Sequence, residues 1–139
     1  MKMQKNSATR SAIMRAVRSK DTRPEMVVRR LVHGLGYRYR LHGKGLPGKP
    51  DLVFASRRKV ILVNGCFWHG HNCTRGARQP TENADYWTAK IKSNVERDLA
   101  SAAALQSAGW QMLTVWECET KVRDRDALLK RLVDFLEDI

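Results

Sequence analysis

The sequence predicts a single α/β domain in which helices flank a β-sheet. Short apolar runs bounded by glycine and proline indicate strands, and apolar residues three or four apart indicate amphipathic helices. The chain has 139 residues, of which 42% are hydrophobic and 29% charged, so one hydrophobic core can form without disulfide bonds. No apolar run reaches the roughly 18 residues of a membrane-spanning helix, and the N-terminus lacks the apolar stretch of a signal peptide.

The expected elements follow in the order helix, three strands, helix, strand, helix. Residues 1–20 are basic and polar and should form an arm that becomes ordered on its partner, followed by one domain over residues 21–139. Asp21 or Thr22 should cap the first helix, and Gly36 should end it. Strands are expected at 37–41, 52–54, 60–63 and 110–116, and helices at 85–108 and 126–136. The longer helix should bury a face made of Trp87, Ile91, Val95, Leu99, Ala102 and Leu105.

Positive charge is concentrated in the first third of the chain. The net charge is +12, and residues 1–50 hold 13 lysines and arginines against only Asp21 and Glu25. Such a concentration indicates a polyanionic partner, and nucleic acid fits best. A merely soluble basic surface and an anionic membrane are the alternatives, and the membrane alternative lacks an amphipathic anchor or a lipidation motif.

Three cysteines and a histidine have a spacing that a tetrahedral metal can use. Cys66, His71 and Cys73 lie in one short segment and Cys118 lies 45 positions further on, which together use every cysteine in the chain. Such a closed set is typical of structural zinc, because it leaves no open position for a reacting water. Cys118 could instead be a small buried hydrophobe. Three cysteines cannot all pair in disulfides, which favours a reducing cytoplasm.

Asp51 and His69 are the candidate catalytic residues. Asp51 follows Gly48-Lys49-Pro50 and opens a strand, where a carboxylate can bind Mg²⁺ or can merely cap a turn. His69 and His71 are two positions apart, so in an extended segment their rings point to opposite sides. If His71 faces zinc, His69 faces the Asp51 strand, where its imidazole could take a proton from an attacking water.

Two adjacent aromatics, Phe67 and Trp68, cannot both point into a core from a regular element. Aromatic side chains beside basic surfaces can stack on bases or separate base pairs, and Trp87 could join them. Trp87 could equally begin the apolar face of its helix. Lys90 and Asn94 lie about one turn apart from Trp87, so these three should share a face.

Several segments resemble the very-short-patch repair (Vsr) DNA mismatch endonucleases. They are Pro47-Gly48-Lys49-Pro50-Asp51, Gly65-Cys66-Phe67-Trp68-His69 through Cys73, Asn94-Val95-Glu96-Arg97-Asp98 and Val115-Trp116-Glu117-Cys118. The similarity extends to Ala8-Thr9-Arg10-Ser11 and Met14-Arg15-Ala16, so it covers nearly the whole chain.

The resemblance implies a PD-(D/E)XK restriction-endonuclease-like fold and a monomeric bacterial enzyme that nicks double-stranded DNA 5′ to the thymine of a T:G mismatch. Catalysis would use Mg²⁺, a structural Zn²⁺ would hold the fold, and a DNA cytosine methyltransferase and a repair polymerase would act before and after it. The resemblance assigns Mg²⁺ to Asp51 and the Val63 carbonyl, the general base to His69, and water or His69 orientation to Glu25 and Asp98. It assigns Zn²⁺ to Cys66, His71, Cys73 and Cys118, and DNA contacts to Phe67, Trp68, Trp87, Met14, Lys90 and Asn94.

The chain departs from the wider superfamily in the strand after Asp51. The second acidic residue and the lysine expected there are missing, and Val63-Asn64-Gly65 stands in their place. Val63 occupies a position where threonine is frequent, which a main-chain ligand tolerates. Two alternatives remain: a zinc-stabilised DNA-binding protein without catalysis, and a related nuclease with another mismatch or site preference.

Overall fold

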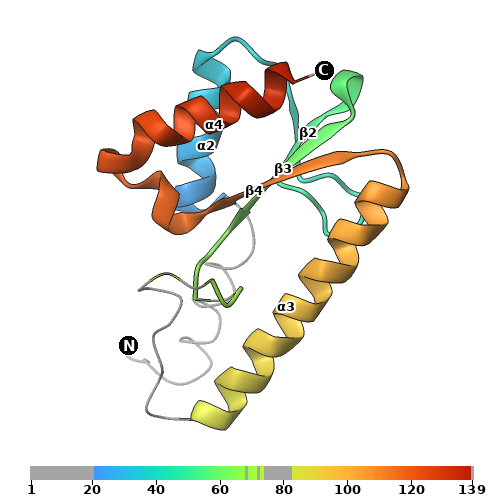
Figure 1. Ribbon diagram of the computed structural model, residues 1–139, viewed down its shortest axis with the longest axis vertical. Coiled ribbons are helices and arrows are strands. Elements are labelled where there is room, and N and C mark those ends of the chain that lie inside the picture. Colours follow the sequence, from blue (N-terminus) through green and yellow to red (C-terminus); the bar gives the residue numbers. More distant parts are fainter. Residues whose placement is uncertain (1–20, 68, 72, 74–82, 139) are drawn as a thin grey trace, which may run out of the picture.

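A mixed four-stranded sheet forms the centre of the molecule (Figure 1). The computed structural model describes residues 21–67, 69–71, 73 and 83–138. The strands β1 (Arg40–Leu41), β2 (Leu52–Phe54), β3 (Lys59–Asn64) and β4 (Gln111–Trp116) lie in that order, with helices α2 (Arg23–Gly34), α3 (Ala84–Ser107) and α4 (Arg125–Glu137). The pairs β1–β2 and β2–β3 are antiparallel, whereas β3–β4 is parallel because α3 crosses between them.

The helices cover the two faces of the sheet (Figure 1). Helices α2 and α4 lie on one face, where alternate strand residues form the larger apolar cluster with them. That cluster contains Val28, Val32, Leu52, Phe54, Ile61, Val115, Leu128, Leu132 and Leu136. Helix α3 lies on the opposite face, where Leu105 packs with Val53 and Val60. The predicted α/β class and the predicted order of elements are therefore confirmed.

The first helix begins where the sequence predicts. Thr22 is the N-cap, since its side chain accepts a hydrogen bond from the Glu25 amide, and Pro24 lies in the first turn. Gly36 follows with φ of +93°, a conformation that glycine adopts without steric cost. The second strand of the predicted hairpin is buried, as expected, because it lies between two neighbouring strands.

Two details of the predicted elements are wrong. The strand expected over 37–41 is only Arg40–Leu41, because β2 is three residues long and pairs only with those two. Leu99 does not belong to the buried face of α3, since 68% of it is exposed. The inward face instead passes through Asn94, Asp98 and Leu105, about 100–140° around the helix from Leu99.

A buried lysine joins the sheet to the last helix. Lys59, only 4% exposed, donates from Nζ to the carbonyl oxygens of Phe135 at 2.5 Å, Leu136 at 3.4 Å and Asp138. These carbonyls lie at the C-terminal end of α4, where a cation is favourable. Within the described part of the chain, no helix is both long and apolar enough to cross a membrane.

Candidate active site and metal centre

The candidate site lies where the parallel strands β3 and β4 end. Asn64 pairs with Trp116 at the last step of the ladder, so the segments that follow the two strands begin side by side. One of these segments carries Cys66, His69 and His71, and the other carries Cys118. Residues that are about 50 positions apart in sequence are therefore brought to one edge of the sheet, as expected for parallel strands.

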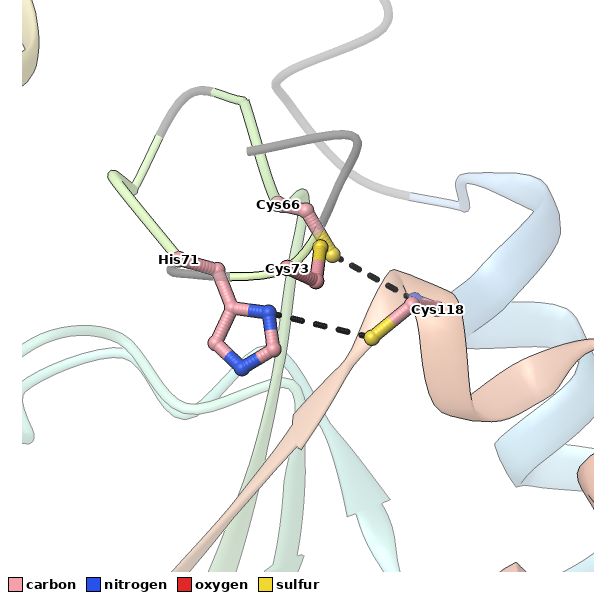
Figure 2. A group of neighbouring side chains, drawn as sticks. All are labelled: Cys66, His71, Cys73 and Cys118. Carbon is pink, nitrogen blue, oxygen red and sulfur yellow. Dashed lines mark hydrogen bonds between the residues drawn. The ribbon is translucent and has the colours of Figure 1, made fainter. Parts of the chain in front are cut away.

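The predicted metal ligands converge on one point (Figure 2). The Sγ atoms of Cys66, Cys73 and Cys118 and a ring nitrogen of His71 all lie within 4.8 Å of one another. Cys118 Sγ is 3.7 Å from His71 Nδ1, and the Cys118 amide donates to Cys66 Sγ at 3.3 Å. The spacing of the three cysteines and His71 in the sequence thus correctly predicted a cluster of three thiols and one imidazole.

The surroundings of this cluster suit thiolates held by a cation. Burial raises the pKa of the Cys66 thiol to about 12 and raises that of Cys118 as well. Buried thiols lose their protons most readily to a metal, whose positive charge replaces the lost solvation. The His71 ring stacks on Trp116, with 4.2 Å between ring centroids, which fixes the plane of the imidazole. The donor set therefore fits a four-coordinate zinc.

Asp51 lies beside the end of β3. Its Oδ2 accepts a 2.7 Å hydrogen bond from the Val63 amide, so carboxylate and Val63 backbone are adjacent. Burial raises the pKa of Asp51 to about 6, the Val63 hydrogen bond opposes that rise, and the nearby Glu25 charge adds to it. A half-buried carboxylate close to a second carboxylate is an environment that favours a bound cation.

His69 is paired with a carboxylate on the long helix. His69 Nδ1 lies 2.5 Å from Asp98 Oδ2, and the His69 amide donates to the Gly65 carbonyl at 3.2 Å. An Asp98 carboxylate can only accept, so in the neutral imidazole the proton lies on Nδ1 and the lone pair on Nε2. An imidazole oriented in this way can accept a proton from water.

Gly70 allows this segment to approach α3 closely. Its φ is +66°, and a Cβ at this position would lie 3.0 Å from Val95 Cγ2 and 3.1 Å from Ile91 Cγ2. A side chain would therefore push the segment away from the helix that carries Asp98. The close packing on α3 fixes the distance between His69 and its partner.

Glu25 lies in a charged network that sequence reasoning only partly found. It is 1% exposed, and its two oxygens accept from the Asp21 amide at 3.0 Å and Arg29 Nη1 at 3.3 Å. His42 Nε2 lies 2.9 Å from Glu25 Oε2. Neither Arg29 nor His42 carried a sequence signal, apart from the position of His42 between a strand and Gly43.

Three aromatic rings, those of Phe67, Tyr86 and Trp87, form a group beside the segment that carries Cys66. The Phe67 and Trp87 rings meet edge to face with centroids 5.9 Å apart, and Tyr86 contacts Trp87 at 5.0 Å. Lys90 is half-buried, and Asn94 is only 7% exposed and accepts a hydrogen bond from Arg97. Trp87, Lys90 and Asn94 therefore share one face of α3, as predicted, and Asn94 is the most buried of the three.

The chain is similar to the proteins of one known family. The family model described as DNA mismatch endonuclease Vsr matches residues 3–75, which is more than half of the chain. A Xanthomonas oryzae protein named Type II nicking enzyme V.XorIIP is 52% identical over 128 residues, covering 92% of each chain. This chain belongs to the Vsr family. It is a DNA endonuclease, as the sequence resemblance predicted.

Further relatives of this Vsr-family protein carry related names. The Escherichia coli (strain K12) protein named DNA mismatch endonuclease Vsr is 40% identical and aligns with 94% of this chain and 85% of its own length. Among solved structures, the catalytic domain of homing endonuclease I-Bth0305I is similar in fold, with a TM-score of 0.58 and 21% identity. The match covers 83% of this chain and 94% of that domain, and it supports a nuclease fold.

The Vsr-family residues predicted from sequence fall into two groups. The structure brings together the cluster of Cys66, His71, Cys73 and Cys118, the pair of His69 with Asp98, and the neighbours Asp51, Glu25 and Val63. Trp68, Met14 and the arm 1–20 lie outside the described residues. Their roles, like all the catalytic and DNA-contacting roles, remain predictions.

Proposed function

We propose that this Vsr-family enzyme nicks double-stranded DNA 5′ to the thymine of a T:G mismatch by Mg²⁺-dependent hydrolysis of a phosphodiester. One observation carries the proposal: an oriented imidazole, His69 on Asp98, lies at the same end of the sheet as the half-buried Asp51. Family membership argues against the alternative of a DNA-binding protein without catalysis.

His69 is the proposed general base. With Nδ1–H bound to Asp98, Nε2 takes a proton from water as the water oxygen bonds to phosphorus. The bond from phosphorus to the leaving sugar oxygen then breaks, and that oxygen takes a proton from a solvent water. Asp98 stabilises the imidazolium that forms, in the same way that a carboxylate orients histidine in other hydrolases.

Asp51 is the proposed ligand of the catalytic ion, with the Val63 main-chain carbonyl as a second contact. The observation that fits is a carboxylate whose pKa is raised by burial and by the neighbouring Glu25, since a cation there removes the unfavourable charge. Bound Mg²⁺ would supply Lewis acidity to the phosphate and charge stabilisation to the leaving oxygen. Glu25 is proposed to orient water at this site.

The cysteine–histidine cluster is proposed to hold a structural zinc. All four donors are protein side chains, so no position remains for a substrate. Its role would be to connect the segment that carries His69 to the segment after β4. Such a connection keeps the general base at a fixed distance from Asp51, which efficient catalysis requires.

DNA recognition is proposed to use the aromatic group and the basic N-terminal third. Phe67 and Trp87 would insert beside the mismatch together with Trp68, and Met14 would contact the opposite groove. Lys90 and Asn94 would contact the DNA on the same face of α3 as Trp87, and the arm of residues 1–20 would bind phosphates. Separating base pairs costs least at a mispair, so insertion would itself favour mismatched sites.

The fold and context complete the proposal. The mixed sheet with helices on both faces, together with the nuclease-like fold match, supports a PD-(D/E)XK domain spanning residues 21–139. The enzyme would act as a monomer in the bacterial cytoplasm. Its substrate would arise from deamination of 5-methylcytosine at sites of a companion methyltransferase, and a polymerase would complete the repair.

A nicking assay tests the proposal directly. Purified protein is mixed with Mg²⁺ and with labelled duplexes that carry a T:G mispair, other mispairs or only matched pairs, each in several flanking sequences. The expected result is a single nick 5′ to the mispaired thymine, which Asp51→Asn abolishes while binding persists. Preferential nicking at another mispair would replace the T:G assignment, and full nicking by Asp51→Asn would remove Asp51 from the mechanism.

A further inference from the structure

His42 is tied to Asp51 through the main chain. Its amide donates to the Asp51 carbonyl at 2.9 Å, which continues the β1–β2 ladder by one residue beyond the Leu41–Leu52 pair. The φ of His42 is +51°, in the left-handed region that few side chains adopt and that histidine and asparagine tolerate better than most. A residue kept in this conformation beside a candidate catalytic carboxylate suggests a functional constraint.

The unusual backbone conformation accompanies a contact between the His42 ring and Glu25. Nε2 lies 2.9 Å from Oε2 of Glu25, a side chain that is 1% exposed, while the imidazole is 26% exposed. An ionised carboxylate has only acceptor atoms, so the ring must donate its Nε2 proton. His42 is therefore bound to Asp51 by its main chain and to Glu25 by its side chain.

The group of Asp21, Glu25 and His42 has the composition of a metal site, yet a protein cation already occupies it. Arg29 Nη1 lies 2.7 Å from Asp21 Oδ1 and 3.3 Å from Glu25 Oε2. Since the guanidinium balances both carboxylates, a second metal ion would have to displace it. The network instead holds each Glu25 oxygen in place, with the Asp21 amide on Oε1 and His42 and Arg29 on Oε2.

We infer that His42 is a positioning residue of the nuclease site. Its Nε2–H orients the buried Glu25 carboxylate, while its backbone amide holds the main chain of Asp51, so that the two acidic side chains keep a constant separation. The inference rests on the proposed roles of Asp51 and Glu25. Groups that orient the residues of a metal site commonly change activity or metal affinity about 10- to 100-fold when they are removed.

Two substitutions at position 42 separate this role from a purely structural one. His42→Asn tolerates a positive φ but is too short to reach Glu25, whereas His42→Gln places an amide N–H about where Nε2 lies. We expect His42→Asn to lower the nicking rate at saturating DNA and Mg²⁺ by about tenfold or more. His42→Gln should recover most of that loss, and neither variant should change the KM for DNA.

A spectroscopic measurement tests the contact without activity. The ¹⁵N resonances of the His42 ring should show a proton on Nε2, and Glu25→Gln should shift that resonance. The exposed His33 in the last turn of α2 serves as a matched control, since His33→Asn should leave both the nicking rate and the His42 ring resonances unchanged.

Three results would overturn the inference: a wild-type nicking rate for His42→Asn, equal losses in His42→Asn and His42→Gln, or an Nε2 atom without a proton. Asp51→Asn in the same series separates this failure from that of the proposed function. If Asp51→Asn is inactive and His42→Asn is fully active, only the role of His42 fails. If Asp51→Asn nicks normally, the proposed function fails.

Discussion

Replacing the charge of Asp51 should stabilise the fold while it removes activity. In the absence of Mg²⁺, burial raises the pKa of Asp51 from 3.8 to about 6, so at neutral pH the folded protein holds an ionised carboxylate in an unfavourable place. Asp51→Asn keeps an oxygen that can accept from the Val63 amide and keeps the side-chain volume. The variant therefore differs from the wild-type protein mainly in the charge at position 51.

The size and sign of the effect follow from the two pKa values. A difference of about two pH units corresponds to about 3 kcal/mol, because each unit is worth about 1.4 kcal/mol. Below the unfolded pKa of 3.8 both states are protonated and the carboxylate costs nothing. The cost grows as the pH rises above the unfolded pKa of 3.8 and is complete above the folded pKa of about 6, so the variant should be more stable by about 3 kcal/mol at pH 8 and about half that at pH 5.

Thermal and urea unfolding in Mg²⁺-free buffer with zinc retained would measure the difference. For a chain of 139 residues, about 3 kcal/mol corresponds to roughly 10 °C in Tm. Asp134→Asn is the matched control, because this exposed residue forms an i,i+4 ion pair with Lys130 that is worth about 0.5 kcal/mol or less. Added Mg²⁺ should reduce the difference in unfolding free energy between Asp51→Asn and the wild type, because it should bind only the wild type. Equal stability at pH 8, or a gap that does not change with pH, would refute the reasoning.

Four further outcomes are expected. Cys118→Ser should lower bound zinc well below one per chain by atomic absorption and lower Tm, and full zinc content would exclude Cys118 as a ligand. Gly70→Ala should destabilise the fold by about 1–3 kcal/mol and slow nicking, whereas Gly34→Ala, with open space around it, should be neutral or stabilising in the same unfolding assay. Asp98→Asn should slow nicking about 100-fold or more with unchanged DNA affinity, and a wild-type rate would remove Asp98 from the mechanism. Deleting residues 1–20 should weaken DNA binding and flatten the salt dependence of log K, and an unchanged slope would mean that the arm does not contact phosphate.

Most of the fold could be predicted from the sequence because its helix starts and its hairpin depend on residues that are close together in the chain. Thr22 and Pro24 mark a helix start through caps that involve only the next few residues. The apolar runs of β2 and β3 lie close enough in sequence to form a hairpin. The strand expected at 37–41 proved shorter because its length depends on a partner strand, which no local pattern reports.

The buried face of α3 shows where apolar spacing misleads. Stepping by four from Val95 reaches Leu99, which is exposed, whereas the inward face carries Asn94 and Asp98. Asp98 pairs there with His69, and Asn94 accepts a hydrogen bond from Arg97, so polar contacts rather than apolar packing hold these two side chains. A helix whose inner face serves a polar site cannot be oriented from hydrophobicity alone.

The candidate site was predictable to the extent that side-chain chemistry is distinctive. Four residues of metal-binding type and a carboxylate after Gly-Lys-Pro stand out from composition and spacing. His42 and Arg29 do not, because their roles depend on a left-handed backbone at His42 and on contacts between α2 and the loop before β2. Such contacts exist only in the folded chain.

The position of Cys118 also determines when the site can form. Its segment follows β4, which pairs with β3 only after the whole of α3 has crossed the sheet. A chain still emerging from the ribosome therefore lacks one of the four donors until more than four-fifths of it has been synthesised. Since the proposed zinc site is completed last, we expect incomplete translation products to lack nicking activity.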